Sequence, residues 1–236
     1  MPVPPVLRAE WIKIRTLRPL LGSLCAVLLA TTAFSGLAAN GADDSDPLFS
    51  AFLGVSFGQI AAVAFGATAV SAEFRGGALR LTLSAVPDRL RWYAAKVTAI
   101  ALPVLAVGLV TGLVTLVLGR FLLGADRPAW SDGLRGALGC GVYLTLMALF
   151  AAGCAAVLRS GTATLGVLIP FLLIVSFVIG DMSGSVADVL PDRAGQVVLH
   201  TSWDGLLGPW SGLAVTAAWA GAALVAGAWC VRRRDA

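Results

Sequence analysis

The fold is decided by residues 71–96, which read SAEFRGGALRLTLSAVPDRLRWYAAK and lie between two long apolar runs. The runs on either side, residues 51–71 and 97–119, each supply about the 20 apolar residues that a helix needs to cross a bilayer. A charged segment of this length between two spans is typical of a loop at the membrane surface. The number of further spans then sets the fold class.

The composition is that of a membrane protein with several spans. Apolar residues make up 58% of the 236, charged residues only 13%, and the mean hydropathy is +0.87, which leaves too little polar surface to cover a soluble globule. The sequence holds six apolar runs of about the length of a membrane span, and we predict six spans. The runs lack the alternation of barrel strands, so each is expected to satisfy its own backbone hydrogen bonds as a helix. They are residues 20–39, 51–71, 97–119, 134–158, 162–180 and 210–231.

The fold class predicted is therefore an all-α membrane protein, with residues 1–236 forming one transmembrane domain. Lys and Arg near span ends are retained on the cytoplasmic side. An N-terminus inside the cell places all but four of the 17 basic residues on that side, which predicts that both termini are cytoplasmic. The four exceptions are Arg120, Arg127, Arg135 and Arg193. The net charge of +4 is thus assigned to a membrane face rather than to nucleic acid.

Residues 6–19 before the first span are predicted to form an amphipathic helix in the inner headgroup layer. Leu7, Trp11 and Ile14 follow helical spacing, with Arg8 and Arg15 to one side. Two interpretations stay open, a basic topology anchor and a specific mechanical role. The residues assigned to the membrane interface are Glu10, Trp11, Lys13 and Arg15.

The second span carries small residues at four-residue spacing, which on a helix form a groove that another backbone can approach closely. We therefore expect a partner helix to pack on Gly54, Gly58, Ala62 and Gly66. The segment from Asp181 to Pro209 has apolar clusters broken by proline and glycine. It is predicted to form one or two short helices that lie against the outer leaflet or dip into it.

Several chemistries are disfavoured by the residues. No Asp, Glu, Lys or Arg lies near the centre of a predicted span, which argues against an ion-coupled carrier. The four cysteines lie in spans and there is one histidine, so neither a disulfide framework nor a metal site is expected. A G-x-S-x-G pattern surrounds Ser56, but it lies in a predicted helix and its nominal base, His200, has no evident orienting carboxylate. Buried polar residues such as Gln59 and Tyr143 are interpreted as helix-to-helix hydrogen bonds.

The charged segment also carries an ordered motif. After a span come Glu73, Gly76-Gly77, the leucine-periodic LRLTL at 79–83, Pro87, Arg89 and Lys96, and the leader reads AEWIKIRTLR at 9–18. This order resembles the membrane subunits, or permeases, of type 2 ATP-binding-cassette (ABC) exporters, whose pattern is roughly E-x-x-x-G-T, L, P-x-S-R and K. Gly77 stands where the family commonly has Thr, and Asp88 where it has Ser.

The resemblance implies that residues 72–96 form a coupling loop on a separate cytoplasmic ABC ATPase. Glu73 is expected to pair with Arg75, Arg80 or a basic group of that ATPase. No G-x-x-x-x-G-K-[ST] phosphate loop is present, so no cofactor is expected on this chain, which is predicted not to be an enzyme. ATP and Mg²⁺ belong to the partner. The residues assigned to coupling are Glu73, Arg75, Gly76, Gly77, Arg80, Pro87, Arg89, Arg91 and Lys96.

The same resemblance implies a second permease chain, identical or different, in a bacterial plasma membrane, with residues 181–209 as re-entrant helices. The cargo is expected to be amphipathic or hydrophobic, such as a drug, an antibiotic, a peptide or a lipid-like molecule, which links the chain to efflux and antibiotic resistance. Two alternatives remain. One is a membrane immunity or sensor protein that binds an antibiotic without transport, and the other is an uncoupled carrier.

Overall fold

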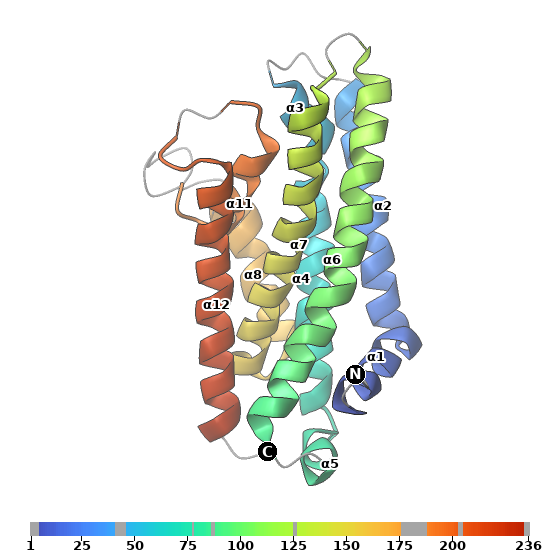
Figure 1. Ribbon diagram of the computed structural model, residues 1–236. Coiled ribbons are helices and arrows are strands. Elements are labelled where there is room, and N and C mark those ends of the chain that lie inside the picture. Colours follow the sequence, from blue (N-terminus) through green and yellow to red (C-terminus); the bar gives the residue numbers. More distant parts are fainter. Residues whose placement is uncertain are drawn as a thin grey trace.

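The computed structural model describes residues 5–40, 46–76, 78–85, 88–124, 127–175, 188–202 and 205–233. These residues form a bundle of helices packed side by side (Figure 1). In chain order the long helices are α2 (Arg18–Asn40), α4 (Val55–Ser71), α6 (Arg89–Leu122), α7 (Trp130–Leu158) and α12 (Pro209–Arg233). The shorter elements are α1 (Pro5–Thr16), α3 (Pro47–Phe52), η1 (Ala72–Phe74), α5 (Ala78–Ala85), α8 (Gly161–Pro170), the π-helical turn η3 (Phe171–Val175), α11 (Pro191–Gln196) and η4 (Val197–Leu199).

Five segments are long and apolar enough to cross a membrane: Arg18–Ala39, Pro47–Phe74, Arg89–Leu122, Trp130–Leu158 and Pro209–Arg233. They correspond to five of the six predicted spans. The remaining predicted span, residues 162–180, is a shorter apolar helix over Gly161–Ile174, and its last residues, 176–180, lie outside the described part of the chain. The chain is thus a helical protein of multi-pass membrane character.

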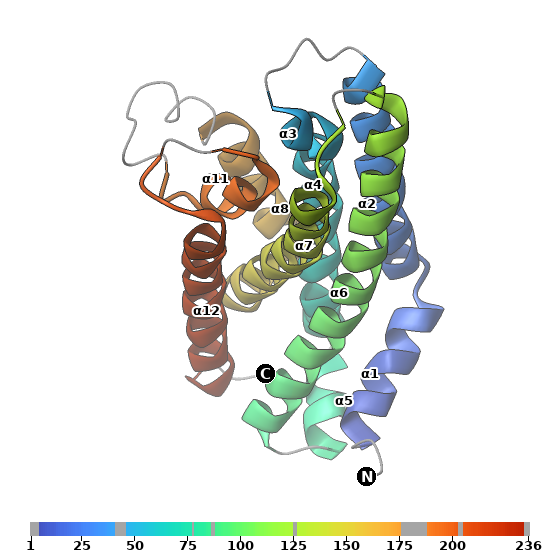
Figure 2. The ribbon, with the colours of Figure 1, turned by 45° about the horizontal axis from the view of Figure 1, so that its top comes forward.

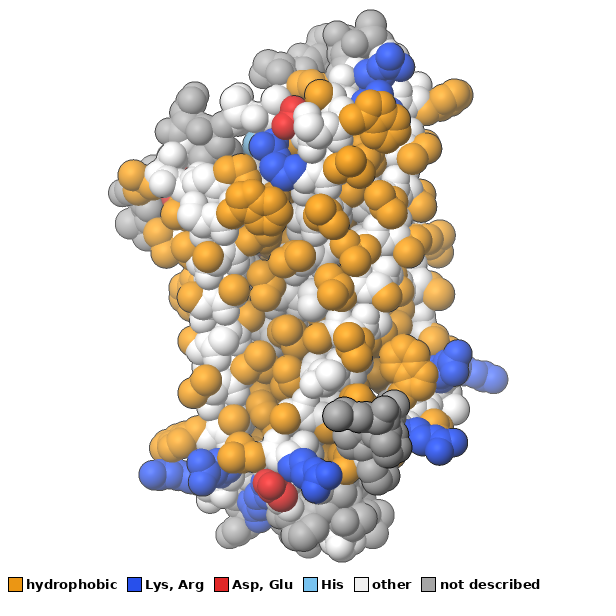
Figure 3. Space-filling view, viewed as in Figure 1, with side chains coloured by type: hydrophobic (Ala, Val, Ile, Leu, Met, Phe, Trp, Pro, Cys, Tyr) orange, Lys and Arg blue, Asp and Glu red, His pale blue; other side chains and the backbone are white. Residues whose placement is uncertain are grey.

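Charge is concentrated at the two ends of the bundle. On the face seen in Figure 3, an apolar and uncharged band separates Lys and Arg side chains at the lower end from others at the upper end. The C-terminal end of α12 lies at the lower end, together with α1 and α5 (Figure 1). We call this lower end the basic end, and the end that carries α3 and α11 the opposite end.

The glycine stripe of α4 packs against two helices rather than one. A Cβ atom at Gly54 or Gly58 would overlap Thr31 of α2, whereas a Cβ atom at Gly66 would overlap the carbonyl oxygen of Ala148 in α7. The reason is geometric: four residues of an α-helix turn through slightly more than one circle, so positions 12 apart differ in direction by about 120°. A four-residue stripe therefore turns from one neighbour to the next.

The segment before α12 forms short helices, as predicted, but its apolar residues lie inside the protein. Figure 2 shows α11 above the end of α12, and α11 also contacts α7. Ala194, Val198 and Leu199 are buried, and a Cβ at Gly139 of α7 would lie 2.5 Å from a Val198 methyl group. Residues 191–199 thus bury apolar side chains against α7 and α12, which offer small-residue surfaces here, while the predicted position of this segment at the outer leaflet stays a prediction. Residues 181–187, 203 and 204 lie outside the described chain.

Candidate functional site: a charged ring at the basic end

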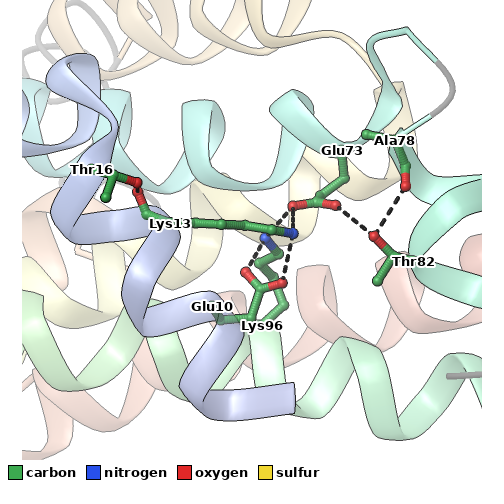
Figure 4. Close-up of polar contacts among 7 residues, drawn as sticks. All are labelled: Glu10, Lys13, Thr16, Glu73, Ala78, Thr82 and Lys96. Atoms are coloured by element: carbon green, nitrogen blue, oxygen red, sulfur yellow. Dashed lines mark hydrogen bonds and ion pairs between the residues drawn. The ribbon is translucent and has the colours of Figure 1, made fainter. Parts of the chain in front are cut away.

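Four charged side chains from three elements meet at the basic end (Figure 4). Glu10 and Lys13 come from α1, Glu73 from η1 and Lys96 from α6. Each ammonium contacts both carboxylates, so the four groups form a closed ring, which we call the charged ring. Two acids and two bases give it no net charge.

The contacts are short and largely shielded from water. Glu73 Oε1 accepts hydrogen bonds from Lys96 Nζ at 2.6 Å and from Lys13 Nζ at 2.8 Å. Glu10 accepts from Lys13 Nζ at 3.0 Å and from Lys96 Nζ through its other oxygen. Glu10, Glu73 and Lys96 are only 2–3% exposed, whereas the Lys13 side chain keeps 38% of its surface. Burial of such charges is tolerated because each is paired and hydrogen-bonded.

Lys13 is the member of the ring that reaches water. Burial lowers its pKa, but the hydrogen bond to Glu73 and the negative charges of Glu10 and Glu73 outweigh burial, so the pKa is raised above the ordinary 10.5. The stability that Lys13 contributes is therefore fully present below pH 10.5 and is lost only as the pH rises above that value. At neutral pH Lys13 therefore keeps its charge.

The ring follows from which face of α1 is buried. Glu10 and Lys13 are three residues apart, so they lie on one side of the helix next to the buried Ile14. That face packs on α6 and α2. Trp11 is 40% exposed, and Arg8 and Arg15 are also exposed. The predicted lipid face of Leu7, Trp11 and Ile14 is therefore split, because Leu7 and Ile14 turn toward the protein with Glu10 while Trp11 turns outward.

The loop after η1 is attached to the ring through α5. Thr82 Oγ1 donates to the Ala78 carbonyl at 3.0 Å and reaches Glu73 Oε2 at 3.5 Å. Gly76 has φ of 61° between η1 and α5, in the left-handed region that glycine adopts without a steric cost. Asp88 then caps α6 by accepting hydrogen bonds from the backbone of Leu90 and Arg91. The predicted coupling loop, residues 72–96, thus contains η1 and α5, and its last residues form the first turns of α6.

The residues assigned to coupling separate into buried and exposed sets. Glu73 and Lys96 are buried, so Glu73 does not present its carboxylate at the surface, and it pairs with Lys13 and Lys96 rather than with Arg75. Arg75, Gly76 and Arg91 are exposed. Arg89 donates to the Val231 carbonyl of α12 at 3.0 Å. Gly77, Pro87 and the side chain of Arg80 lie outside the described chain.

The ring unites two residue groups that the sequence analysis kept apart, the interfacial helix and the coupling loop. One signal in the sequence does point to it. Glu10 and Glu73 are the only glutamates of the chain, and Lys13 and Lys96 are the only lysines, since every other charged side chain is Asp or Arg. All four meet at one place.

A second polar cluster lies at the opposite end and joins α3 to the segment after η4. Asp46 caps α3 by accepting from the backbone N–H groups of Leu48 and Phe49. The same carboxylate contacts His200 Nδ1 at 3.1 Å and accepts from Thr201 Oγ1 at 2.8 Å. Burial raises the pKa of Asp46, but the hydrogen bonds from Thr201 and the Phe49 backbone outweigh burial and lower it below 3.8.

We expect Asp46→Asn to lower the free energy of unfolding at pH 7 by about 1 kcal/mol, because the change weakens both the cap of α3 and the contacts with His200 and Thr201. Because the pKa is depressed, the charge contributes fully above pH 3.8 and loses its effect as the pH falls below that value. The difference between wild type and variant in thermal unfolding should therefore shrink toward pH 3. Asp88→Asn, a cap whose two bonds stay within α6, is the control and should change little. A difference that grows on acidification would contradict the assignment.

The G-x-S-x-G hypothesis can be examined directly. Ser56 lies in α4, a helix rather than a strand-to-helix turn, as predicted. The structure does supply a carboxylate for His200, namely Asp46, which the sequence analysis did not find. Ser56 Oγ, however, donates to Gln196 Oε1 at 3.1 Å, and it makes no hydrogen bond to His200. The residues do not form the nucleophile-to-base contact of a hydrolase.

Comparisons with known proteins do not assign a family. No protein-family model matches the chain, and a search of curated proteins gives no match. Within the described residues, no group of three or more His, Cys, Asp and Glu side chains could hold a metal ion. The chemistry of the basic end therefore has to be judged from its own geometry.

Proposed function

We propose that the chain is the membrane-spanning subunit of an ATP-driven exporter, with its basic end toward the cytoplasm and in contact with a separate ABC-type ATPase. The charged ring is the observation that carries this proposal. It ties α1 and α6 to η1, which continues directly from α4, so a displacement of the loop or of α1 is passed to two long helices. A simple topology anchor would need the basic residues but not two buried glutamates.

The cargo that fits the proposal is amphipathic or hydrophobic, and a second permease chain completes the pathway. ATP and Mg²⁺ act on the partner, while this chain contributes the route through the membrane. The exposed part of the loop binds the ATPase, where Arg75 and Arg91 meet its acidic groups. Movement of the ATPase then displaces the loop, and Glu73 and Lys96 pass this displacement to the helix bundle. The exposed residues thus bind the partner, and the buried residues transmit its movement.

The test begins with the genes adjacent to the one for this chain, where the proposal predicts a P-loop ATPase. The two proteins are purified together, reconstituted in liposomes, and assayed for ATP hydrolysis with a panel of amphipathic compounds. Hydrolysis stimulated by a compound, together with its ATP-dependent movement, supports the exporter. Binding without stimulation or movement would indicate the sensor or immunity protein, and movement without the ATPase would indicate an uncoupled carrier.

The binding surface gives a sharper prediction. Reversing charge with Arg75→Glu and Arg91→Glu together is expected to reduce the ATPase retained on the purified chain by at least tenfold, because two cations facing acidic groups become anions. Folding should be unaffected since both side chains are exposed. The matched control is Arg232→Glu together with Arg233→Glu, two exposed reversals that give the same change of charge at the same end, on α12. Equal loss in the control would show a general charge effect and remove the docking assignment.

A further inference from the structure

A cavity of about 400 Å³ lies at the opposite end of the bundle, between α3, α4, η3 and α11. Its apolar wall is formed by Phe57 of α4 with Leu172 and Leu173 of η3. The volume falls within the range of small-molecule sites. The two leucines belong to a π-helical turn, a feature that is rare and is concentrated at functional sites.

A chain of hydrogen bonds beside the cavity fixes the direction of one amide group. Ser56 Oγ donates to Gln196 Oε1 at 3.1 Å, and Gln196 Nε2 donates to the Tyr143 hydroxyl at 3.2 Å. The Tyr143 O–H group in turn donates to Gln59 Oε1. With its oxygen held in this way, Gln59 is left with its Nε2 group as a donor.

That donor has no protein acceptor among the described residues, although Gln59 is only 3% exposed and lines the cavity. Unlike Thr115 Oγ1, which is enclosed without a partner, Gln59 Nε2 keeps access to the cavity, so an acceptor on a bound molecule can reach this donor. The charged lining groups, Asp192 and Arg193, carry opposite charges. The cavity therefore favours an uncharged ligand.

We propose that this cavity binds an amphipathic molecule through an ester or amide carbonyl, which accepts a hydrogen bond from Gln59 Nε2. The apolar body of the ligand lies against Phe57, Leu172 and Leu173. Tyr143 and Gln196 are positioning residues, since they orient the Gln59 amide and do not themselves provide the contact. The site is independent of the proposed ATPase coupling, because it lies at the other end of the bundle and involves no member of the charged ring.

The test uses a matched pair of photoreactive probes on the purified full-length chain in lipid nanodiscs. One probe is a diazirine-bearing monoacylglycerol, whose ester supplies the carbonyl, and the other is its alkyl-ether analogue, which lacks it. After irradiation, labelled peptides are quantified by mass spectrometry. The ester probe is expected to label the peptides of α4 and η3 about 2- to 10-fold more than the ether probe, the factor that one neutral hydrogen bond supplies. Equal labelling of these peptides by both probes would overturn the proposal, as would labelling confined to the exposed face of α6 around Val117.

Variants separate the donor from the cavity itself. Gln59→Met keeps the length of the side chain without the N–H group, so the ester-to-ether ratio should fall to about one while the ether probe still labels. Leu173→Trp fills the cavity without touching the hydrogen-bond chain, and it should reduce labelling by both probes. This variant tests the cavity independently, also when Gln59→Met folds poorly. Thr115→Val, a buried hydroxyl of α6 away from the cavity, is the control and should keep the wild-type ratio. An unchanged ratio in a folded Gln59→Met protein would refute the role of the amide.

The carbonyl can come from a membrane lipid or from a free amphiphile, and the lipid of the nanodisc distinguishes them. If lipid esters occupy the cavity, replacing diester phospholipids by dialkyl-ether phospholipids should increase probe labelling severalfold. If the ligand is a free amphiphile, the exchange should leave labelling unchanged. Either result supports the carbonyl site, provided that the wild-type preference for the ester probe is present.

Discussion

Glu73→Ala is expected to lower the free energy of unfolding by about 3–5 kcal/mol, the cost of leaving a buried charge without its partner. In the variant the buried Lys96 ammonium keeps Glu10 as its only carboxylate, and the ring carries a net positive charge. ATPase-coupled transport should be abolished as well, because η1 is then detached from α1 and α6. Unfolding in denaturing detergent measures the first effect, and cargo-stimulated ATP hydrolysis measures the second.

Two variants separate stability from coupling. Glu73→Gln combined with Lys96→Met leaves a neutral pair, Glu10 with Lys13, so most of the stability should return while transport stays low. Asp132→Ala removes an acid from a partly exposed ion pair with Arg135 at 3.6 Å, and should cost no more than about 1 kcal/mol. Wild-type stability and transport in Glu73→Ala would show that the ring has no part in either.

Gly66→Leu is expected to prevent close packing of α4 on α7 and to destabilise the bundle by about 3 kcal/mol or more, as overpacking of a tight interface does. The obstacle at this position is backbone, the carbonyl group of Ala148, which cannot rotate out of the way. Gly58→Leu meets the side chain of Thr31 and should be damaging to a smaller extent. The readout is the yield of monodisperse protein and its unfolding midpoint in detergent.

The control for this prediction is a glycine in another long helix. Gly221 lies in α12, and a Cβ atom there meets nothing within 4 Å. Gly221→Leu should therefore leave yield and midpoint close to those of the wild type. Similar losses in both variants would mean that any bulky residue in these helices is harmful, and the tight packing of α4 on α7 would not be the cause.

The long helices could be predicted because their signal is local. A run of about 20 apolar residues has only one satisfactory backbone structure in a membrane, so the ends of the five long segments were predicted to within a few residues, except that α6 begins at Arg89 and not at residue 97. The break between α3 and α4 at Leu53-Gly54 was missed, because both residues keep helical backbone angles and neither is a strong helix breaker here. The small-residue stripe was recognised, whereas its division between α2 and α7 depends on how three helices are arranged.

Only the Glu10–Lys13 half of the charged ring could be predicted from the sequence. Helical spacing places Glu10 beside Lys13, but nothing local connects this pair to Glu73 or Lys96, which join it only when α1 lies across α6. The charges of the loop were therefore assigned to a partner protein. The opposite end was harder still, because the bonds of Gln196 and His200 to residues about 150 positions earlier follow from the fold and from no motif.

The separation of the ring's members along the chain sets an order of assembly. Glu10 and Lys96 are 86 residues apart, and α2 and α4 are synthesised between them. A newly made α1 must therefore wait, its glutamate satisfied by water and by Lys13, until α6 has been synthesised and has packed beside it. Closure of the ring is then a late step in biogenesis, and it can occur only in molecules in which α2, α4 and α6 have assembled correctly.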